Sequence, residues 1–415
     1  MKKTIITLSI LALFANVYTQ TENPTPCRKL IELDYQTGYL DCNNKMVIPP
    51  RYDIIPRYIP RHGDRRLFHE GYAAIYKNDK WGFIDVNGKE IAPPKYDFIQ
   101  NFQNGFAVVI LNGKYGFIDT TGKEVVPLKY DKPIWVLWGF HEGYAEAGLN
   151  GKWGFVDTTG KEVIPIKYDH VWYFSNGRAA VRLDGKCGFI NTIGKVVIPL
   201  KYDMVQSFHE GRAAVKMNDK WGFIDTAGKE VIPIKYDQVV TFVGNRAMVT
   251  LNNKYGYIDT TGSEVIPLKY DHGQPVFSEG RTVVWSGRKA GFIDINGKQI
   301  TPFIYDDAIS FTESRARVKL YNGYGFVDLD GRSVVSPKYE HAGWFSEGYA
   351  VVKRNGKYGY IDLDGNEFIP PKYDGATSFY QGIARVKLRD REFYIDLDDN
   401  EIDLNPDAAI EPTDF

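Results

Sequence analysis

The chain has 415 residues, of which 43% are apolar and 25% are charged, the balance of an ordinary globular protein. Because 51 Lys and Arg stand against 52 Asp and Glu, the net charge is −1, and the basic excess typical of nucleic-acid binders is absent. An aromatic content of 14% together with 40 glycines favours strands and tight turns and excludes a disordered chain.

Residues 1–19 have the pattern of a secretory signal peptide. Two lysines precede the apolar run 5–14, and we expect cleavage before Gln20. The run is too short to cross a bilayer, so no transmembrane segment is expected in the mature chain. Cys27 is not placed as the acylated cysteine of a lipoprotein. The expected location is therefore secreted or periplasmic.

Residues 20–37 form an N-terminal segment that contains the first of three cysteines. Cys27 and Cys42 lie 15 residues apart, in a compartment that the signal peptide predicts to be oxidising. A disulfide between them would stabilise the start of the chain by about 3 kcal/mol, and two unpaired thiols are the alternative. Cys187 replaces an aromatic residue at a repeated position, which predicts a buried side chain.

An aromatic residue followed by glycine recurs along the chain. Successive glycines are 34 residues apart except for single intervals of 38 and 35 residues, which is typical of a tandem repeat. About eleven units are predicted to fill residues 38–400, and residues 401–415 form a tail. The glycines of the nine most regular units are at positions 82, 116, 154, 188, 222, 256, 291, 325 and 359.

Each unit is predicted to contain three short strands. In residues 178–208 these strands cover 179–182, 188–190 and 196–198, with turn residues between them. Most third strands contain a proline, which donates no backbone hydrogen bond and therefore suits the edge of a sheet.

The two turns of a unit have distinct signatures. Asn-Gly at 112–113, 150–151 and 355–356 is the strongest short hairpin signal, and it marks the first turn. The second turn begins with Asp and ends with Gly, where a hairpin needs a left-handed residue. We expect Asn44 and Asn400 to replace this glycine in the end units, because Asn tolerates positive φ best among the other residues.

The predicted fold is all-β, with three-stranded repeats of about 34 residues stacked as an elongated solenoid, because one unit cannot bury its own apolar face. A closed propeller-like ring is the alternative. The solenoid is favoured because propeller blades usually have four strands and about 40 or more residues.

The sequence Lys-Trp-Gly-Phe-Val-Asp-Thr-Thr-Gly-Lys-Glu-Val-Ile-Pro at 152–165 resembles the bacterial WG-repeat family, and the resemblance covers nearly the whole mature chain. It implies a bacterial protein, often associated with the cell envelope, and it implies no enzymatic activity. The chain departs from the family pattern at Cys187, Ala290 and 393–394. A function that requires the aromatic residue in every unit is therefore not expected.

The sequence holds none of the nucleophile-elbow, phosphate-loop, dinucleotide or zinc-protease motifs. Asp157, Asp225 and Asp259 recur at one turn position, which indicates a structural role. We expect a protein without enzymatic activity or cofactor. An envelope enzyme that acts on glycans, with a carboxylate pair among these acids, is the alternative.

Two groups of polar residues were considered as metal sites. His69, His141 and His209 share one position in Phe-His-Glu-Gly, but ligands from units two apart would have to converge within about 2 Å of a zinc ion. Residues 362–367 resemble part of a calcium loop, but they align with the ordinary second turn. No metal site is predicted.

Irregular segments are the best candidates for binding, since insertions in a repeat array map to loops on one face. The repeated aromatic residues are expected in the core rather than in an exposed ladder for sugars. We expect a binding or scaffold module for an envelope protein or polysaccharide whose identity is unknown. The candidate contact residues, from the stretch 54–66 and the lengthened unit, are Arg57, Arg61, Arg65, Arg66, Trp135 and Trp138.

If the signal peptide is cleaved as expected, the exported protein starts near Gln20 and carries no lipid. Mass analysis of the N-terminus of the exported protein measures this directly. An intact Met1 or an acylated Cys27 would contradict the assignment.

Overall fold

The computed structural model describes residues 29–33, 36–41, 45–54, 68–131, 139–380 and 382–402. The regular elements in these ranges are all β-strands. No helix long and apolar enough to cross a membrane is present among the described residues. The chain divides into two compact units, residues 1–128 and 129–415. The predicted signal peptide, Cys27 and Cys42 lie outside the described residues.

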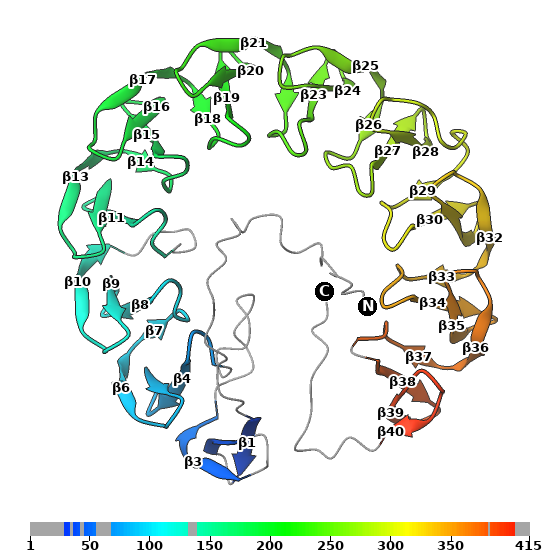
Figure 1. Ribbon diagram of the computed structural model, residues 1–415, viewed down its shortest axis with the longest axis horizontal. Coiled ribbons are helices and arrows are strands. Elements are labelled where there is room, and N and C mark those ends of the chain that lie inside the picture. The colour runs from blue at the N-terminus through cyan, green and yellow to red at the C-terminus, as the bar shows by residue number, and fades with distance from the viewer. Residues whose placement is uncertain are drawn as a thin grey trace, which may run out of the picture. The chain divides into compact units, whose positions relative to one another are not determined.

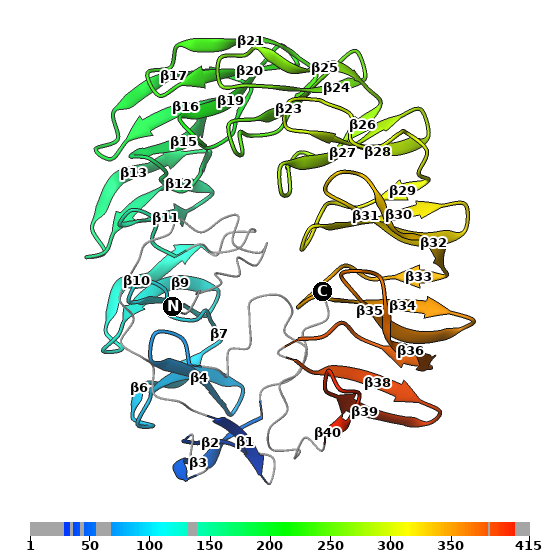
Figure 2. The ribbon, with the colours of Figure 1, turned by 45° about the vertical axis from the view of Figure 1, so that its right-hand side comes forward.

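The described strands form eleven small antiparallel sheets, numbered here 1 to 11 in chain order. In the second unit, sheets 4 to 11 follow one another along the chain, each beside the next (Figures 1 and 2). The predicted all-β repeat of small sheets is therefore confirmed. Sheet 1 begins at Lys29, before the boundary at residue 38 that the sequence suggested.

The strands of sheets 1 to 3 are β1 (Lys29–Leu33), β2 (Gln36–Leu40) and β3 (Met46–Asp53); β4 (Tyr72–Lys77), β5 (Lys80–Asp85) and β6 (Glu90–Tyr96); and β7 (Phe98–Ile99), β8 (Phe106–Leu111), β9 (Lys114–Asp119) and β10 (Glu124–Asp131). Those of sheets 4 to 7 are β11 (Tyr144–Leu149), β12 (Lys152–Asp157) and β13 (Glu162–Tyr168); β14 (His170–Val171), β15 (Arg178–Leu183), β16 (Lys186–Asn191) and β17 (Val196–Tyr202); β18 (Met204–Val205), β19 (Arg212–Met217), β20 (Lys220–Asp225) and β21 (Glu230–Tyr236); and β22 (Gln238–Val239), β23 (Ala247–Leu251), β24 (Lys254–Ile258) and β25 (Glu264–Tyr270). Those of sheets 8 to 11 are β26 (His272–Gly273), β27 (Arg281–Ser286) and β28 (Lys289–Asp294); β29 (Asp307–Ala308), β30 (Arg315–Leu320), β31 (Gly323–Asp328) and β32 (Ser333–Tyr339); β33 (His341–Ala342), β34 (Tyr349–Arg354), β35 (Lys357–Asp362) and β36 (Glu367–Tyr373); and β37 (Gly375–Ala376), β38 (Ala384–Leu388), β39 (Arg391–Ile395) and β40 (Glu401–Ile402).

Seven of these sheets have four strands, so the expected count of three strands per unit is too low. The additional strand has only two residues and pairs with the first long strand, as β14 pairs with β15 through His170 and Val171. Two residues are too few for a recognisable alternation in the sequence. The strand count therefore no longer argues against a closed ring.

The turns follow the predicted chemistry, with one error of register. Asn112 and Gly113 both have positive φ, as the Asn-Gly signal requires. Gly160 has φ of 83° and donates its N–H to the carbonyl of Asp157 at 2.9 Å. In the last unit the left-handed residue is Asp399, not Asn400 as predicted, because Asp399 has φ of 63° and donates to the carbonyl of Asp396. Asn44 lies outside the described residues.

The glycine of the aromatic-Gly pair is required by a close backbone approach. The register of β12 on β13 shifts between Trp153 and Phe155, which brings the third strand against Gly154. A Cβ on Gly154 would lie 2.4 Å from the carbonyl oxygen of Ile164. In the last sheet Phe393 stands where the glycine would be, and the third strand β40 has only two residues and no register shift. The glycine thus permits the bulge that extends the third strand.

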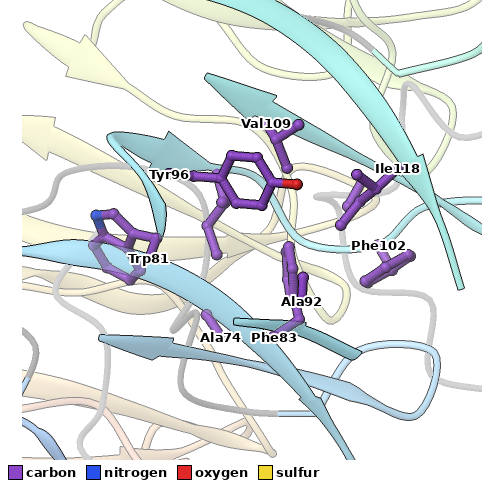
Figure 3. Packing of buried hydrophobic residues seen from close by; sticks show 10 residues of the cluster. Ala74, Trp81, Phe83, Ala92, Tyr96, Phe102, Val109 and Ile118 are labelled. Carbon is purple, nitrogen blue, oxygen red and sulfur yellow. The ribbon is translucent and has the colours of Figure 1, made fainter. Parts of the chain in front are cut away.

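Within each unit, consecutive sheets share a hydrophobic core. Between sheets 2 and 3, Phe83 and Ala92 pack with Phe102, Val109 and Ile118 (Figure 3). In the second unit, cores made of residues from consecutive sheets recur in the same way. This shared burial is the stacking that the apolar pattern predicts.

Carboxylates also link consecutive sheets. Asp203, after the third strand of sheet 5, accepts hydrogen bonds from Lys186 Nζ of its own sheet at 2.7 Å and from the N–H of Asn218, in the first turn of sheet 6, at 2.8 Å. These two bonds lower the pKa of Asp203. The same pair of bonds recurs at Asp97, Asp237, Asp271 and Asp374.

A second carboxylate links each of several sheets to the turn that precedes the first long strand of the next sheet. Glu142 accepts the N–H groups of Asn176 and Gly177 at 2.7 and 2.9 Å, and it has positive φ itself. Equivalent bonds are made by Glu70, Glu210 and Glu313.

We expect Gly154→Ala to lower the free energy of unfolding by about 1–3 kcal/mol, because the new methyl group displaces the third strand. Gly375→Ala is the matched control: its Cβ would meet nothing closer than the Cβ of Lys387 at 3.4 Å, and we expect a change within about 0.5 kcal/mol. Urea denaturation measures both variants. Equal effects would show that the close approach is not the reason for the glycine.

Candidate binding surface

The contact residues chosen from the sequence are not placed by the structure. All six lie outside the described residues, and their role in binding stays a prediction. They are Arg57, Arg61, Arg65 and Arg66 of the stretch 54–66, and Trp135 and Trp138 of the lengthened unit.

The repeated aromatic residues are buried as expected in sheets 2 and 3, and they are only partly buried in most of the later sheets. Trp81 is 5% exposed and Tyr115 is fully buried, whereas Trp153 is half-buried. The ring of Trp153 lies over Gly148 on the opposite strand, where a Cβ would be 2.8 Å from the ring. A continuous ladder of exposed rings is therefore not formed by this position in the described sheets.

The two departures from the aromatic position are also packed. Cys187 is buried, as predicted, and burial raises the pKa of its thiol. At Ala290 the aromatic residue is supplied by Trp285, which lies directly opposite on β27. An aromatic side chain is therefore still present at this pair of positions, on β27 instead of β28.

The repeated aspartates of the second turn are used by the turn itself. Asp157 accepts the hydroxyl of Thr159 at 2.6 Å and the N–H groups of Thr159 and Lys161, which lowers the pKa of Asp157. Asp362 accepts the N–H groups of Asp364 and Asn366, so the calcium-like segment is an ordinary second turn. Asp225 and Asp259 make the same bonds.

The histidines of Phe-His-Glu-Gly have no shared site in the described residues. His141 packs on Tyr173 with ring centroids 4.8 Å apart, and burial lowers the pKa of His141. Among the described residues, no group of three or more His, Cys, Asp or Glu could hold a metal ion.

Glu146 is an unusual acid. It lies on β11 opposite Phe155, at the position that Ala180 and Ala214 occupy in sheets 5 and 6. Burial raises the pKa of Glu146 to about 7. A carboxyl group with this pKa can exchange a proton near neutral pH, as a general acid does.

Large exposed aromatic side chains lie at positions that the sequence analysis did not select. Trp344 is 50% exposed and Tyr380 is 52% exposed. Both belong to the segments that lead into the first long strands of sheets 10 and 11, β34 and β38. They lie beside the turns that accept glutamate links: Glu347 accepts the N–H of Gly382 at 2.9 Å. Several other sheets hold a small polar residue at the position of Trp344, such as Ser207, so a repeat-by-repeat alignment would have shown the change.

Tyr321 is the most exposed aromatic residue described, at 80%. It stands in the first turn of sheet 9 with φ of 55°, a position at which other sheets use Asn. It lies at the opposite end of the first strand from the glutamate-linked turn, so it does not join Trp344 and Tyr380.

Matches to the family described as WG containing repeat cover almost the entire series of sheets. The chain belongs to this family. The matched residues are 38–58, 66–81, 81–115, 115–153, 153–187, 188–221, 221–255, 255–284, 291–323, 324–358 and 358–391.

Solved structures show only distant similarity to this WG-repeat protein, and no curated protein matches it. A eukaryotic initiation factor is 11% identical, covers 82% of this chain and 94% of its own, and has a TM-score of 0.38. Hsv2 of Kluyveromyces lactis is 11% identical over 54% and 89%, with a TM-score of 0.32. The dihydro-heme d1 dehydrogenase NirN is 14% identical over 86% and 75%, with a TM-score of 0.26.

We expect Glu146→Gln to stabilise the protein above pH 7 by about 1–3 kcal/mol and to change little below pH 4.5. Because the pKa of Glu146 is raised on folding, its contribution to stability is present at low pH and is lost as the pH rises from about 4.5 through 7. Thermal or urea unfolding at pH 4.5 and pH 8 measures this. The exposed Glu230→Gln is the control, and a stability gain for Glu146→Gln that is the same at both pH values would contradict the assignment.

Proposed function

We propose that this WG-repeat protein is a secreted or periplasmic binding or scaffold module without enzymatic activity, whose partner is an envelope protein or glycan. Two features support this. The recurrent carboxylates are engaged in turns and in links between sheets. The exposed rings of Trp344 and Tyr380, in contrast, have no evident role in holding the sheets together.

Trp344 is the observation that carries the proposal. Half of its side chain is exposed at a position where Ser207, Thr241, Ser310 and Ser378 show that a small polar residue is sufficient for the repeat. Tyr173, the aromatic residue at this position in sheet 5, is only partly exposed and packs on His141. An exposed indole offers a large contact area at a low entropic cost, and Trp is enriched in binding hot spots.

For the arrangement of the repeats we propose an open, elongated array rather than a closed ring. The last sheet supports this, because it has lost the aromatic-Gly pair and most of its third strand, as an end unit would. Small-angle X-ray scattering tests it: an open array gives a broad, skewed distance distribution, and a ring gives a compact one.

A glycan-acting envelope enzyme is the second candidate, and Glu146 is the observation that favours it. A carboxyl group with a pKa of about 7 suits the general acid of a glycosidase. Hydrolysis of purified cell-wall polymers by the wild type, and its loss in Glu146→Gln, would establish this function in place of the first.

We expect the double variant Trp344→Ser/Tyr380→Ser to weaken capture of the partner from envelope extract by at least about 2 kcal/mol, roughly thirtyfold. The melting temperature should stay nearly unchanged, because both side chains are half-exposed. Tyr321→Asn is the matched control, since it removes an exposed ring at the other end of a sheet and should leave capture intact. Undiminished capture by the double variant would remove the support that Trp344 gives; Trp135→Ala/Trp138→Ala then tests the loop predicted from the sequence.

A further inference from the structure

Arginine side chains fill the space between some consecutive sheets. Arg212, the first residue of β19 in sheet 6, donates from Nε and Nη2 to the carbonyl oxygen of Thr260 in the second turn of sheet 7, both at 3.2 Å. Arg281 and Arg315 donate from Nε in the same way, to Leu329 at 3.2 Å and to Leu363 at 2.7 Å. In each case the acceptor lies 48 residues after the arginine.

Tyr72 occupies the arginine position in sheet 2. Its ring packs on Phe102 of the core, with centroids 4.5 Å apart. The residue 48 positions later is Thr120, in the second turn of sheet 3. Between them lies an open hollow of about 270 Å³, lined by Tyr72, Asp85, Lys89, Glu90, Ile91, Thr120 and Thr121.

The walls of this hollow have the same chemistry as the site that Arg212 fills. The turn Asp-Thr-Thr-Gly is identical at 119–122 and 259–262, and the Asp, Lys and Glu at 85, 89 and 90 recur at 225, 229 and 230. Ile91 corresponds to Val231. The main difference between the two places is therefore the residue at the start of the first strand, tyrosine in one and arginine in the other.

We propose that the hollow between sheets 2 and 3 binds the arginine side chain of a partner protein. The carbonyl oxygen of Thr120 accepts the guanidinium N–H groups, as the carbonyl of Thr260 does for Arg212. Asp85 and Glu90 carry negative charge and Lys89 positive charge in the lining. Arg51 adds a positive charge beside it, where it donates to the carbonyl oxygen of Gly88 at 2.7 Å. The site therefore recognises the guanidinium group by its hydrogen-bond acceptors rather than by net charge. The hollow has room for several water molecules, and a guanidinium group replaces them. This site stands on different residues from Trp344, so it holds whether or not the proposed function does.

The probe is N-acetyl-argininamide, titrated against the full-length protein with isotope-labelled Ile and Thr methyl groups. We expect the methyl signals of Ile91 and Thr121 to shift, and we expect the neutral isostere N-acetyl-citrullinamide to bind at least about tenfold more weakly. Tyr72→Arg should abolish the shifts, because the chain then fills its own hollow as it does at Arg212. Tyr72→Phe keeps the ring and should keep the binding.

The reverse change supplies a readout that does not depend on the folding of Tyr72→Arg. Arg212→Tyr should open a second hollow, so that the methyl signal of Thr261 shifts with the probe when it did not in the wild type. Equal binding of the citrulline compound, or shifts that survive in a folded Tyr72→Arg, would overturn the proposal. Absence of any new shift in a folded Arg212→Tyr would overturn it as well.

Discussion

The structure depends on hydrogen bonds that a carboxylate of one sheet accepts from the turn N–H groups of the next. A hairpin turn with two left-handed residues exposes N–H groups that its own strands cannot use. Asp203 satisfies such a group in the following first turn, and Glu142 satisfies two in the following glutamate-linked turn. Sheets 5 and 7 are therefore held by a glutamate of the sheet before them at one end of the hairpin, and sheets 6 and 7 by an aspartate at the other. The shared apolar core lies between these links.

This arrangement gives many of the repeated acidic residues a structural role. The carboxylates that recur accept several hydrogen bonds, which stabilises their ionised form and lowers the pKa of Asp157 and Asp203. Glu146 behaves differently, at a position that is alanine in the next two sheets: burial raises the pKa of its carboxyl group.

The repeat length, the two turns and the third strand at a sheet edge could be predicted from the sequence, because turn chemistry and apolar spacing are local. The burial of the repeated aromatic residue was predicted correctly for Trp81 and Tyr115 but not for Trp153, which is only partly buried. The fourth strand could not be predicted, since β14 has two residues and is defined by its pairing with β15. The tolerance of Asn for positive φ predicted Asn400, but the hydrogen bond from the N–H of Asp399 to the carbonyl of Asp396 decides the register. Trp344 could not be predicted from irregular spacing, because it lies in a unit of regular length.

Specificity in a tandem repeat must come from positions where one sheet differs from the others, because a residue present in every sheet serves the contacts that every sheet makes. Glu146 is such a position, whereas Tyr72 and Trp344 stand at positions that vary among the sheets. In all three cases a residue that other sheets use is found elsewhere in the same chain. The substitutions Tyr72→Arg, Glu146→Ala and Trp344→Ser introduce residues that the fold already accommodates at an equivalent place. A loss of binding or activity in such a variant therefore reports on function rather than on folding, which is seldom possible for a half-buried residue in a protein without repeats.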